Sequence, residues 1–289
     1  MVKLCSILLA AVLAATSGTA DSLLVVSWNL ENFFDNRADG TSDSEAEFSS
    51  SGRRHWSARR LDAKCAGISK VLLMIADSYG RLPDAVALQE VENRRVLKRL
   101  ISGTALRKLD YAIVHFDSPD HRGIDCALFC RKSTLKLLRA HPAHIFDGGE
   151  PVPTRDILVA EFDSLAILVN HHPSKVGGKD SRRALAMARM MELCDSLGGR
   201  ILCVGDFNDD LWHNGGPGTI KYNGEWEKID GHFAFGGLSV REEVFCSGDV
   251  LLEEDRGFGG LKPRRTYVGL KYNGGISDHL PLALIVYFR

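Results

Sequence analysis

ILCVGDFNDD (residues 201–210) decides the fold, because it is an apolar run that stops at a Gly-Asp-aromatic-Asn sequence. A short apolar run bounded by turn residues is typical of a buried strand. Asp206 and Asn208 stand where this strand ends. There an Asp can orient or deprotonate a water molecule, and an Asn can donate its amide to a phosphate oxygen. The same two residues could also do no more than close an Asx turn.

Four more segments join an apolar run to a polar side chain at its edge. They are WNLEN (28–32) with Asn29, LQEVEN (88–93) with Glu90, VNHHPS (169–174) with His171, and ISDHLPL (276–282) with Asp278 and His279. Taken singly, each of these polar side chains could equally be an ordinary surface, turn or core residue. Taken together, five strand edges with compatible groups favour a shared site, because metal-assisted hydrolysis of a phosphate ester requires such groups at one edge.

Side-chain chemistry gives each of these candidates a role. The Glu90 carboxylate can hold Mg²⁺ or Mn²⁺, which prefer oxygen ligands. His171 can donate to a non-bridging phosphate oxygen, best as an imidazolium, whereas His172 points to the opposite side of a continuing strand. Asp230, in EKIDGHF, can hold a histidine in one tautomer or can cap a turn. The Asp-His pair at 278–279 can supply a metal contact and an acid or base.

Apolar strand patterns outnumber helical patterns along the chain. We predict strands at 23–30, 85–91, 111–116, 126–131, 157–162, 165–172, 201–207 and 282–288, and helices at 56–79, 93–109 and 181–198. Several strands follow one another without a helix, so sheet-on-sheet packing with helices on the outer faces fits better than a doubly wound parallel sheet. Residues 36–53, 213–225 and 247–262 are predicted loops, the first of them mobile. Residues 21–289 are predicted to form one domain.

The N-terminus has the pattern of a signal peptide. Lys3 precedes an almost wholly apolar run (residues 4–15), and Gly18 and Ala20 stand at −3 and −1 of a cut after residue 20. The run is too short to span a bilayer comfortably, so we expect no stable membrane anchor and an exported protein, periplasmic or secreted. Export permits disulfides, but buried free thiols explain most of the cysteines beyond residue 20 more simply.

The five segments together resemble the endonuclease/exonuclease/phosphatase superfamily, with the motifs in the family order from WNLEN to SDHLP. GDFN and SDH carry most of the resemblance. It implies an α/β fold, a four-layer sandwich of two mixed β-sheets packed face to face, and a phosphodiesterase or phosphatase that uses Mg²⁺ or Mn²⁺. Carried over residue by residue, it implies a metal site at Asn29, Glu90 and Asp278, phosphate stabilisation by His171, water activation by Asp206 beside Asn208, and an Asp230–His279 pair.

Three arginines are candidates for substrate binding. HRGIDCALF (121–129) looks like a segment of bacterial members of the superfamily and offers Arg122 to a phosphate, although an Arg–Asp pair bracing a turn would explain it equally well. LKPRRTY (261–267) offers Arg264 and Arg265 near the SDH motif, where they could line a groove for a phosphate backbone or form a solvated basic loop. RRHWSARRLDAK (53–64) could present Arg53, Arg54 and Trp56 to a polyanion, but we interpret it as a solvated helix start.

The net charge of −1 and the pI of about 6.8 exclude a basic protein that coats nucleic acid, so local patches must hold a polyanionic substrate. We expect a phosphodiesterase of the endonuclease or exonuclease type, with nucleic acid as the first choice of substrate and no protein partner. One alternative is a phosphatase, or a hydrolase of lipid head groups like phospholipase C or sphingomyelinase. The other is a catalytically inactive binding scaffold.

Overall fold

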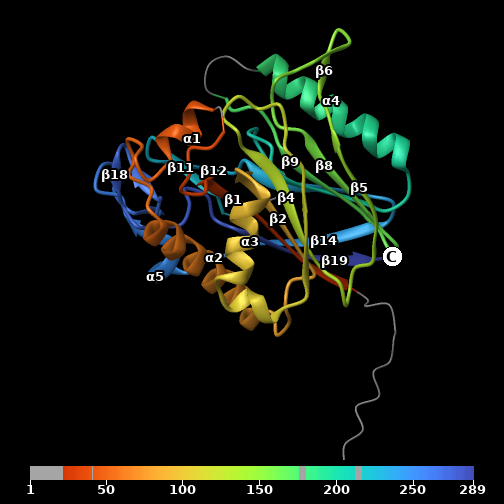
Figure 1. The fold of residues 1–289 in the computed structure, drawn as a ribbon. Helices are drawn as coiled ribbons and strands as arrows, with labels where there is room; N and C mark the ends of the chain where they lie inside the picture. Colours follow the sequence, from red (N-terminus) through yellow and green to blue (C-terminus); the bar gives the residue numbers. More distant parts are fainter. Residues whose placement is uncertain (1–21, 41, 176–179, 212–216) are drawn as a thin grey trace, which may run out of the picture.

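Two mixed β-sheets lie at the centre of the molecule (Figure 1). The computed structural model describes residues 22–40, 42–175, 180–211 and 217–289, so the predicted signal peptide lies outside the described residues. Sheet A has the strand order β14-β19-β1-β2-β4-β3, and sheet B has the order β13-β10-β9-β8-β5. The strands of sheet A are β1 (Ser22–Phe33), β2 (Ala85–Val91), β3 (Tyr111–His115), β4 (Asp125–Arg131), β14 (Leu238–Val244) and β19 (Leu282–Phe288). Those of sheet B are β5 (Leu137–Ala143), β8 (Ile157–Phe162), β9 (Ala166–His171), β10 (Ile201–Asp206) and β13 (Asp230–Phe235).

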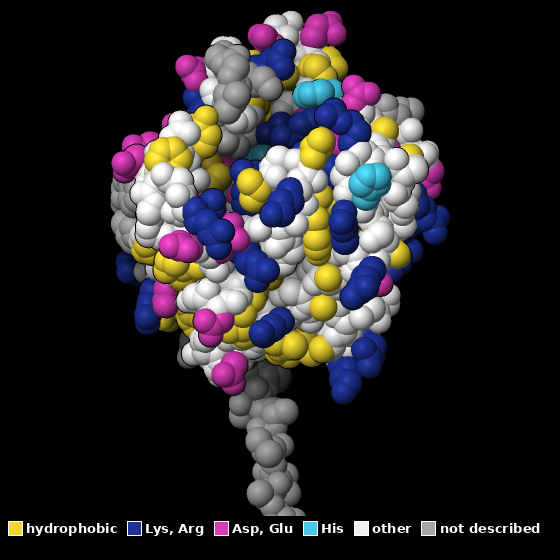
Figure 2. Space-filling view, turned by 90° about the vertical axis from the view of Figure 1, so that its left-hand side faces the viewer, with side chains coloured by type: hydrophobic (Ala, Val, Ile, Leu, Met, Phe, Trp, Pro, Cys, Tyr) yellow, Lys and Arg dark blue, Asp and Glu magenta, His cyan; other side chains and the backbone are white. Residues whose placement is uncertain are grey.

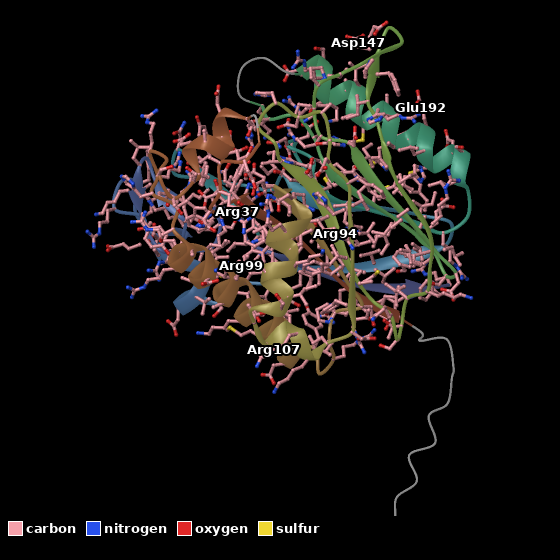
Figure 3. All side chains as sticks on the ribbon, viewed as in Figure 1. Arg37, Arg94, Arg99, Arg107, Asp147 and Glu192 are labelled. Atoms are coloured by element: carbon pink, nitrogen blue, oxygen red, sulfur yellow. The ribbon has the colours of Figure 1, made fainter. Side chains whose placement is uncertain are left out.

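Helices cover the outer faces of both sheets. α2 (Ala58–Ser78) and α3 (Arg94–Ser102) lie beside sheet A, and α4 (Asp180–Leu197) lies along sheet B (Figure 1). The Arg99 guanidinium on α3 forms an ion pair at 2.8 Å with Asp62 on α2 on the outer surface (Figure 3). This ion pair is exposed, so it adds little to the packing of the two helices.

Alternate residues of β10 show the order of the layers. Leu202 and Val204 belong to the core that also contains the side chains of sheet A, whereas Ile201 and Cys203 pack with residues of α4. Both faces of this strand are therefore buried, which explains why its sequence is continuously apolar. Helix, sheet, sheet and helix follow one another, so the predicted four-layer α/β sandwich is confirmed.

The parallel direction of two strand pairs places four strand ends at one rim of the sheets. Among the described strands of the two sheets, β1 is parallel to β2 and β9 is parallel to β10, while the other pairings are antiparallel. The carboxyl ends of a parallel pair lie at the same edge of a sheet. Across the interface β1 contacts β10 and β2 contacts β9. Four carboxyl ends that are far apart in sequence therefore meet.

The eight predicted strands are all present, and four predictions need correction. Loop 36–53 contains α1 (Asp43–Glu47), which Ser42 caps through its hydroxyl oxygen. The predicted helix 93–109 stops at Ser102, and a 3₁₀ turn, η1 (Ala105–Lys108), follows it. Loop 247–262 contains α5 (Gly248–Leu251), β15 (Leu252–Glu254) and β16 (Leu261–Pro263). Within 213–225, the described part includes β11 (Ile220–Tyr222).

Small hairpins extend the molecule beyond the sheets. They are β6 (Phe146–Asp147) with β7 (Glu150–Pro151), β11 with β12 (Glu225–Glu227), β15 with β16, and β17 (Tyr267–Val268) with β18 (Lys271–Tyr272). Several apolar side chains on or beside them are about half exposed or more: Tyr222, Phe258, Leu261, Val268 and Leu270. Such side chains are available for contact with another molecule.

The described cysteines are free thiols, and all except Cys246 are buried. Cys194 on α4 and Cys203 on β10 place their sulfurs 3.4 Å apart. The expectation of buried free thiols therefore describes most of them. Within the described ranges, no helix is long and apolar enough to cross a membrane.

Candidate active site

The carboxyl ends of the two parallel pairs carry four of the predicted site residues. Asn29 and Asp206 join the sheets, because the Asn29 amide Nδ2 donates to Asp206 Oδ2 at 3.0 Å. The His171 Nε2 atom lies 3.7 Å from Asp206 Oδ2 and 3.9 Å from Glu90 Oε1. Residues separated by more than a hundred positions thus share one rim. We refer to Asn29, Glu90, His171, Asp206, Asp230, Asp278 and His279 as the strand-end cluster.

The backbone leaves regular strand geometry at this rim. Glu31, Asn32, Glu90 and Asn208 have φ values of 47°, 52°, 60° and 50°. The β1–β2 register also shifts between Asn29 and Phe33. A non-glycine residue held in this region costs about 1–3 kcal/mol, and such residues gather at functional sites. The turns redirect side chains that would otherwise alternate across the sheet.

Asp230 and His279 form the predicted pair. The His279 Nδ1 atom lies 2.8 Å from Asp230 Oδ2, and since a carboxylate only accepts, Nδ1 carries the proton. The Nε2 atom then faces Asp206 Oδ2 at 3.9 Å. Burial alone would lower the pKa of His279, but the Asp230 charge and hydrogen bond outweigh it and raise that pKa well above its usual value. His279 is therefore an imidazolium with Nε2–H pointing at the rim.

This protonation state decides how the group Asp206, Asp230 and His279 is interpreted. Their ligand atoms lie within 4.8 Å of one another, which is close enough to hold a metal ion. The raised pKa of His279 favours its protonated form, which does not ligate a metal. We therefore interpret these three residues as an acid–base group, in which Asp230 is hydrogen-bonded to His279 and Asp206 faces its Nε2 atom.

Glu90 is held ionised at the end of β2. Its Oε1 atom accepts from the Arg122 guanidinium at 2.8 Å, and its Oε2 atom accepts from the Asn32 backbone N–H at 2.7 Å. Burial by itself would raise the pKa of Glu90, yet the charge of Arg122 and these hydrogen bonds hold it well below its usual range. A permanently ionised, buried carboxylate is suited to a divalent cation.

Asp278 belongs to a partly buried ionic network that the sequence did not indicate. Arg265 joins Asp278 Oδ2 at 2.8 Å to Glu31 Oε1 at 3.0 Å. The Lys64 ammonium, from the middle of α2, donates to the Glu31 backbone carbonyl at 2.6 Å and to Thr266 Oγ1 at 2.8 Å. Burial raises the pKa of Glu31 to about 7 and lowers that of Lys64 to about 8. The network fixes the WNLEN turn against the SDH segment.

Asp206 has the environment of a base. Burial, and then the charge of Asp230, raise the pKa of Asp206 to about 7. Hydrogen bonds from the Asn29 amide and from the Asn208 backbone N–H orient its carboxylate. A carboxylate with a pKa near neutrality is matched to accepting a proton at physiological pH.

His171 faces the rim and His172 faces away from it. The His172 ring packs edge-on against Phe207, with ring centroids 5.1 Å apart. Burial and the nearby charge of Arg155 lower the pKa of His171 well below its usual value, so the imidazole is neutral. The expected imidazolium is therefore not the form held here. Its buried Nδ1 atom has no hydrogen-bond partner among the described residues, and a neutral ring still has one N–H to donate.

Four further predicted residues are placed in different ways. Arg122 lies at the rim, where it joins Glu90, and Arg265 joins Asp278. Arg264 is directed elsewhere: its guanidinium donates to the Asn273 carbonyl at 3.4 Å, so it does not join Arg265 at the rim. The Asn208 amide is already used in part, because its Nδ2 donates to the His172 carbonyl at 3.0 Å.

Arg155 is another residue that sequence reasoning missed. Its guanidinium is buried and donates to the His172 carbonyl at 2.6 Å and to Asp120 at 3.2 Å. Arg155, Glu31 and Lys64 act through contacts between distant segments, so no local pattern marks them. The one available signal was charge: Lys64 interrupts the apolar stripe of its helix, and a buried lysine needs partners.

The oxygen donors at the rim fit a divalent cation. Asn29 offers an amide oxygen that accepts one backbone N–H, from Glu31, and so keeps a free lone pair. Glu90 and Asp278 offer carboxylates, and the Asp278 side chain is 21% exposed. A set made only of oxygen atoms, with room for water, suits a hard cation such as Mg²⁺ or Mn²⁺. Asn29, Glu90 and Asp278 would hold it.

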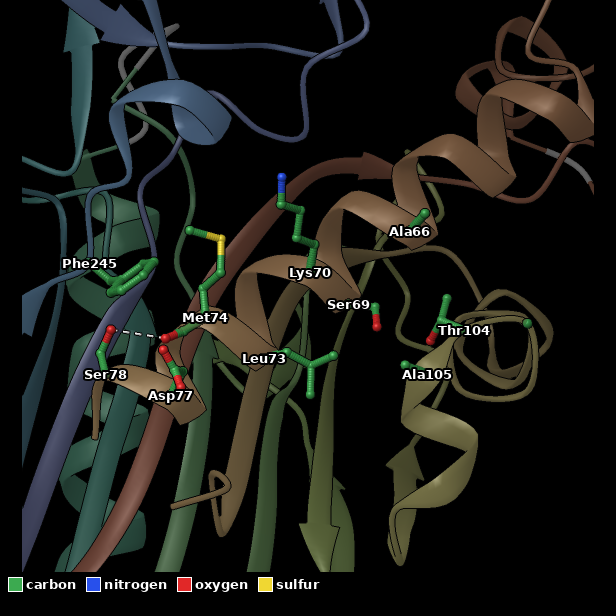
Figure 4. A pocket seen from close by; sticks show the side chains of 11 residues that line it. Ala66, Ser69, Lys70, Leu73, Met74, Asp77, Ser78, Thr104, Ala105 and Phe245 are labelled. Carbon is green, nitrogen blue, oxygen red and sulfur yellow. Dashed lines mark hydrogen bonds between the residues drawn. The ribbon is translucent and has the colours of Figure 1, made fainter. Parts of the chain in front are cut away.

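A small cavity of about 220 Å³ adjoins this rim. Its lining includes Glu31, Asn32, Arg54, Arg265 and Tyr267. A larger hollow of about 560 Å³ lies elsewhere, between α2, the residues around Thr104 and Phe245 (Figure 4). It shares no residue with the strand-end cluster, and its labelled lining mixes apolar residues with Ser69, Lys70, Asp77, Ser78 and Thr104 (Figure 4).

Comparison with known proteins agrees with this geometry. A sequence profile of the endonuclease/exonuclease/phosphatase family matches residues 24–216. The chain belongs to this family. Its members are metal-dependent phosphoesterases, so the chain is a metal-dependent hydrolase of phosphate ester bonds. No curated protein sequence matches it significantly.

Solved structures of low sequence identity share the fold. D. rerio TDP2 humanised by 14 mutations is 15% identical with a TM-score of 0.59, and the match covers 92% of this chain and 99% of that one. A Bacteroides vulgatus endonuclease/exonuclease/phosphatase is 16% identical with a TM-score of 0.56, covering 93% and 99%. D. rerio TDP2 complexed with a single-strand DNA product is 15% identical with a TM-score of 0.55, covering 92% and 98%.

Proposed function

We propose that the protein is a Mg²⁺- or Mn²⁺-dependent phosphodiesterase that cleaves nucleic acid by in-line attack of water on phosphorus. The observation that carries the proposal is the convergence of a base, an imidazolium and an oxygen-donor set on one rim. Asp206, with its pKa near 7, faces the Nε2 atom of His279 at 3.9 Å. Such a constellation serves hydrolysis with a negatively charged transition state.

The protonation state of each residue determines its role in the reaction. Asp206 accepts a proton from the attacking water, and the Asn29 amide keeps its carboxylate in place. His279, held protonated by Asp230, donates through Nε2 to an oxygen of the phosphoryl group. His171 donates its single N–H to a second oxygen. A cation held by Asn29, Glu90 and Asp278 would supply Lewis-acid stabilisation of the charge on the phosphoryl oxygens.

Surface charge supports a polyanionic substrate. Arg122 and Arg265 reach the rim with 36% and 47% of their side chains exposed. Lys and Arg side chains also gather in a recess on the face viewed in Figure 2. Local basic groups of this kind can bind a phosphate backbone although the whole chain is nearly neutral. The single-strand DNA product described with D. rerio TDP2 also supports this substrate class.

Neighbouring arginines provide a matched test of the substrate. Arg265→Gln is expected to weaken binding of single-stranded DNA about tenfold or more, because a charge-assisted hydrogen bond is lost. Arg264→Gln is the control, since its guanidinium points to Asn273. Titration of labelled oligonucleotide at several salt concentrations measures both the affinity and the salt slope. Equal affinities for the two variants, or no salt dependence, would contradict the nucleic-acid assignment.

Lipid head groups are a second candidate substrate, favoured by one observation. Phe258, Leu261, Val268 and Leu270 are 49–66% exposed on the β15–β16 and β17–β18 hairpins. Exposed apolar side chains on loops are suited to contact with an interface. Stimulation of phosphodiester hydrolysis by detergent micelles, together with activity on sphingomyelin and none on DNA, would select this function.

We also propose that the protein is exported and that residues 1–20 are removed as a signal peptide. The support is the sequence pattern of Lys3, the apolar run 4–15 and the small residues Gly18 and Ala20. N-terminal sequencing of the protein from its native cells tests this directly. A chain that starts at residue 21 is expected, whereas an intact first residue would overturn the proposal.

A further inference from the structure

A second acidic site lies beside the strand-end cluster. It is a cavity of about 590 Å³ bounded by the residues before and within α1, the start of α3 and the loop between β3 and β4. We call it the acidic cavity. Its acidic lining residues are Asp39, Glu45, Glu92, Asp117, Asp120 and Asp125, and its basic ones are Arg95 and His121. None of these residues belongs to the strand-end cluster.

Glu92 has an unsatisfied oxygen at this cavity. The residue is 9% exposed, and its Oε2 atom accepts from the Asp35 backbone N–H at 2.5 Å. Its buried Oε1 atom has no hydrogen-bond partner among the described residues. A buried carboxylate oxygen without a partner loses its hydration and gains nothing in return. It therefore marks a position where a ligand would be stabilised.

Negative charge around Glu92 exceeds the positive charge that could balance it. Asp35 and Glu45 are also buried, and both repel the Glu92 carboxylate. Arg95 supplies one positive charge, which it shares between Asp35 at 2.8 Å and Asp39 at 2.6 Å. Within the described residues, neither Glu45 nor Glu92 forms an ion pair. Burial and these neighbouring carboxylates raise the pKa of Glu92 to about 8, and a cation in the cavity would offset the same repulsion.

We propose that the acidic cavity binds a second divalent cation, with Glu92 and Glu45 as its main carboxylate ligands. The lining offers oxygen donors and, apart from His121, Asn93 and Arg95, no side-chain nitrogen. Calcium fits this set best, because it accepts six to eight oxygen ligands, including backbone carbonyls, in flexible geometry. Mg²⁺ is less suited, since it demands a nearly ideal octahedron.

The position of the cavity gives this cation a structural effect on the catalytic rim. The β3–β4 loop that borders it also carries Arg122, whose guanidinium holds Glu90. Ser42 and Asp120, both in the lining, bind the Arg122 backbone: the Ser42 hydroxyl donates to the carbonyl at 3.1 Å, and Asp120 Oδ1 accepts from the N–H at 2.9 Å. A bound cation would thus fix the loop that presents Arg122.

Calorimetry on the full-length protein separates the two cation sites. Protein stripped with EDTA and then desalted is titrated with CaCl₂, first alone and then with saturating MgCl₂. Glu92→Gln and, independently, Glu45→Gln are expected to weaken Ca²⁺ binding at least tenfold. Asp278→Asn is the matched control, because it alters the catalytic rim and leaves the acidic cavity intact. It is expected to retain the Ca²⁺ affinity of the unaltered protein.

Thermal unfolding provides a readout that does not depend on catalysis. Ca²⁺ is expected to raise the Tm of the unaltered protein and of Asp278→Asn, but not that of Glu92→Gln or Glu45→Gln, since a ligand that binds only the folded state stabilises it. Absence of Ca²⁺ binding at millimolar concentration would overturn the proposal. So would Ca²⁺ binding that Asp278→Asn abolishes and the cavity variants retain, because the ion would then lie at the catalytic rim. Failure of the phosphodiesterase assays alone would leave these results unchanged.

Discussion

The chemistry of this protein is decided at single side chains whose protonation is set by their neighbours. Asp230 holds His279 as an imidazolium, and burial brings the Asp206 pKa to about 7. Asp206 and His279 were both predicted from strand-end motifs. Their opposite protonation states could not be predicted from sequence, because these depend on burial and on contacts made only after folding.

Replacement of the base is the most specific test at this scale. Asp206→Ala is expected to lower kcat by about 10²–10³ or more, because both the proton acceptor and the Asn29 contact are lost. Asp209→Ala is the control, as this nearby carboxylate is exposed. Initial rates on a nitrophenyl phosphodiester measure the effect, and circular dichroism checks the fold. A comparable loss in both variants would argue against a special role for Asp206.

The raised pKa of Asp206 also predicts a pH dependence of stability in the metal-free protein. The pKa of this carboxyl is near its ordinary value of 3.8 in the unfolded chain and about 7 in the folded chain. The folded state therefore holds the proton more tightly, so the free energy of unfolding falls as pH rises from about 4 to 7 and then levels off.

Asp206→Asn removes this contribution and serves as the comparison. Urea unfolding in EDTA between pH 4.5 and 8 is expected to show the unaltered protein losing stability relative to Asp206→Asn up to about pH 7. A difference between the two proteins that stays constant with pH would show that Asp206 titrates at an ordinary value.

At the scale of elements, the strands that deliver the site were predictable and the contacts between them were not. β2 and β10 are buried on both faces, so their sequences are continuously apolar and easily recognised. β14 was missed because its sequence, LSVREEV, is largely polar and partly exposed. The turn at Glu31 was missed for another reason: its positive φ is imposed by tertiary contacts, including the Lys64 ammonium, and leaves no local pattern.

Lys64 connects α2 to the site and should matter for stability. Lys64→Met is expected to destabilise the protein by about 3–5 kcal/mol, because the buried carboxylate of Glu31 and the partly exposed carboxylate of Asp278 lose a compensating charge. Lys70→Met, an exposed position on the same helix, is expected to change stability by less than about 0.5 kcal/mol. Urea denaturation measures both. Similar midpoints for the two variants would mean that the network contributes nothing to stability.

At the scale of the whole molecule, the sandwich works as a frame that holds two parallel strand pairs with their carboxyl ends together. Neither sheet contains the complete site: sheet A supplies Asn29 and Glu90, while sheet B supplies His171, Asp206 and Asp230. Function therefore requires the face-to-face packing of the sheets. The sequence indicated this architecture through its family motifs, while the acidic cavity beside the site became visible only in three dimensions.

The most direct measurement is hydrolysis of a nitrophenyl phosphodiester and of single-stranded DNA by the EDTA-treated protein, before and after addition of Mg²⁺ or Mn²⁺. Side chains from both sheets should act together around one cation. We predict no turnover without the metal and recovery of turnover when the metal is returned. Glu90→Gln, which alters the end of β2 in sheet A, and His279→Ala, which alters the SDH segment, should recover almost no activity. Full activity in EDTA, or unimpaired hydrolysis by both folded variants, would contradict this mechanism.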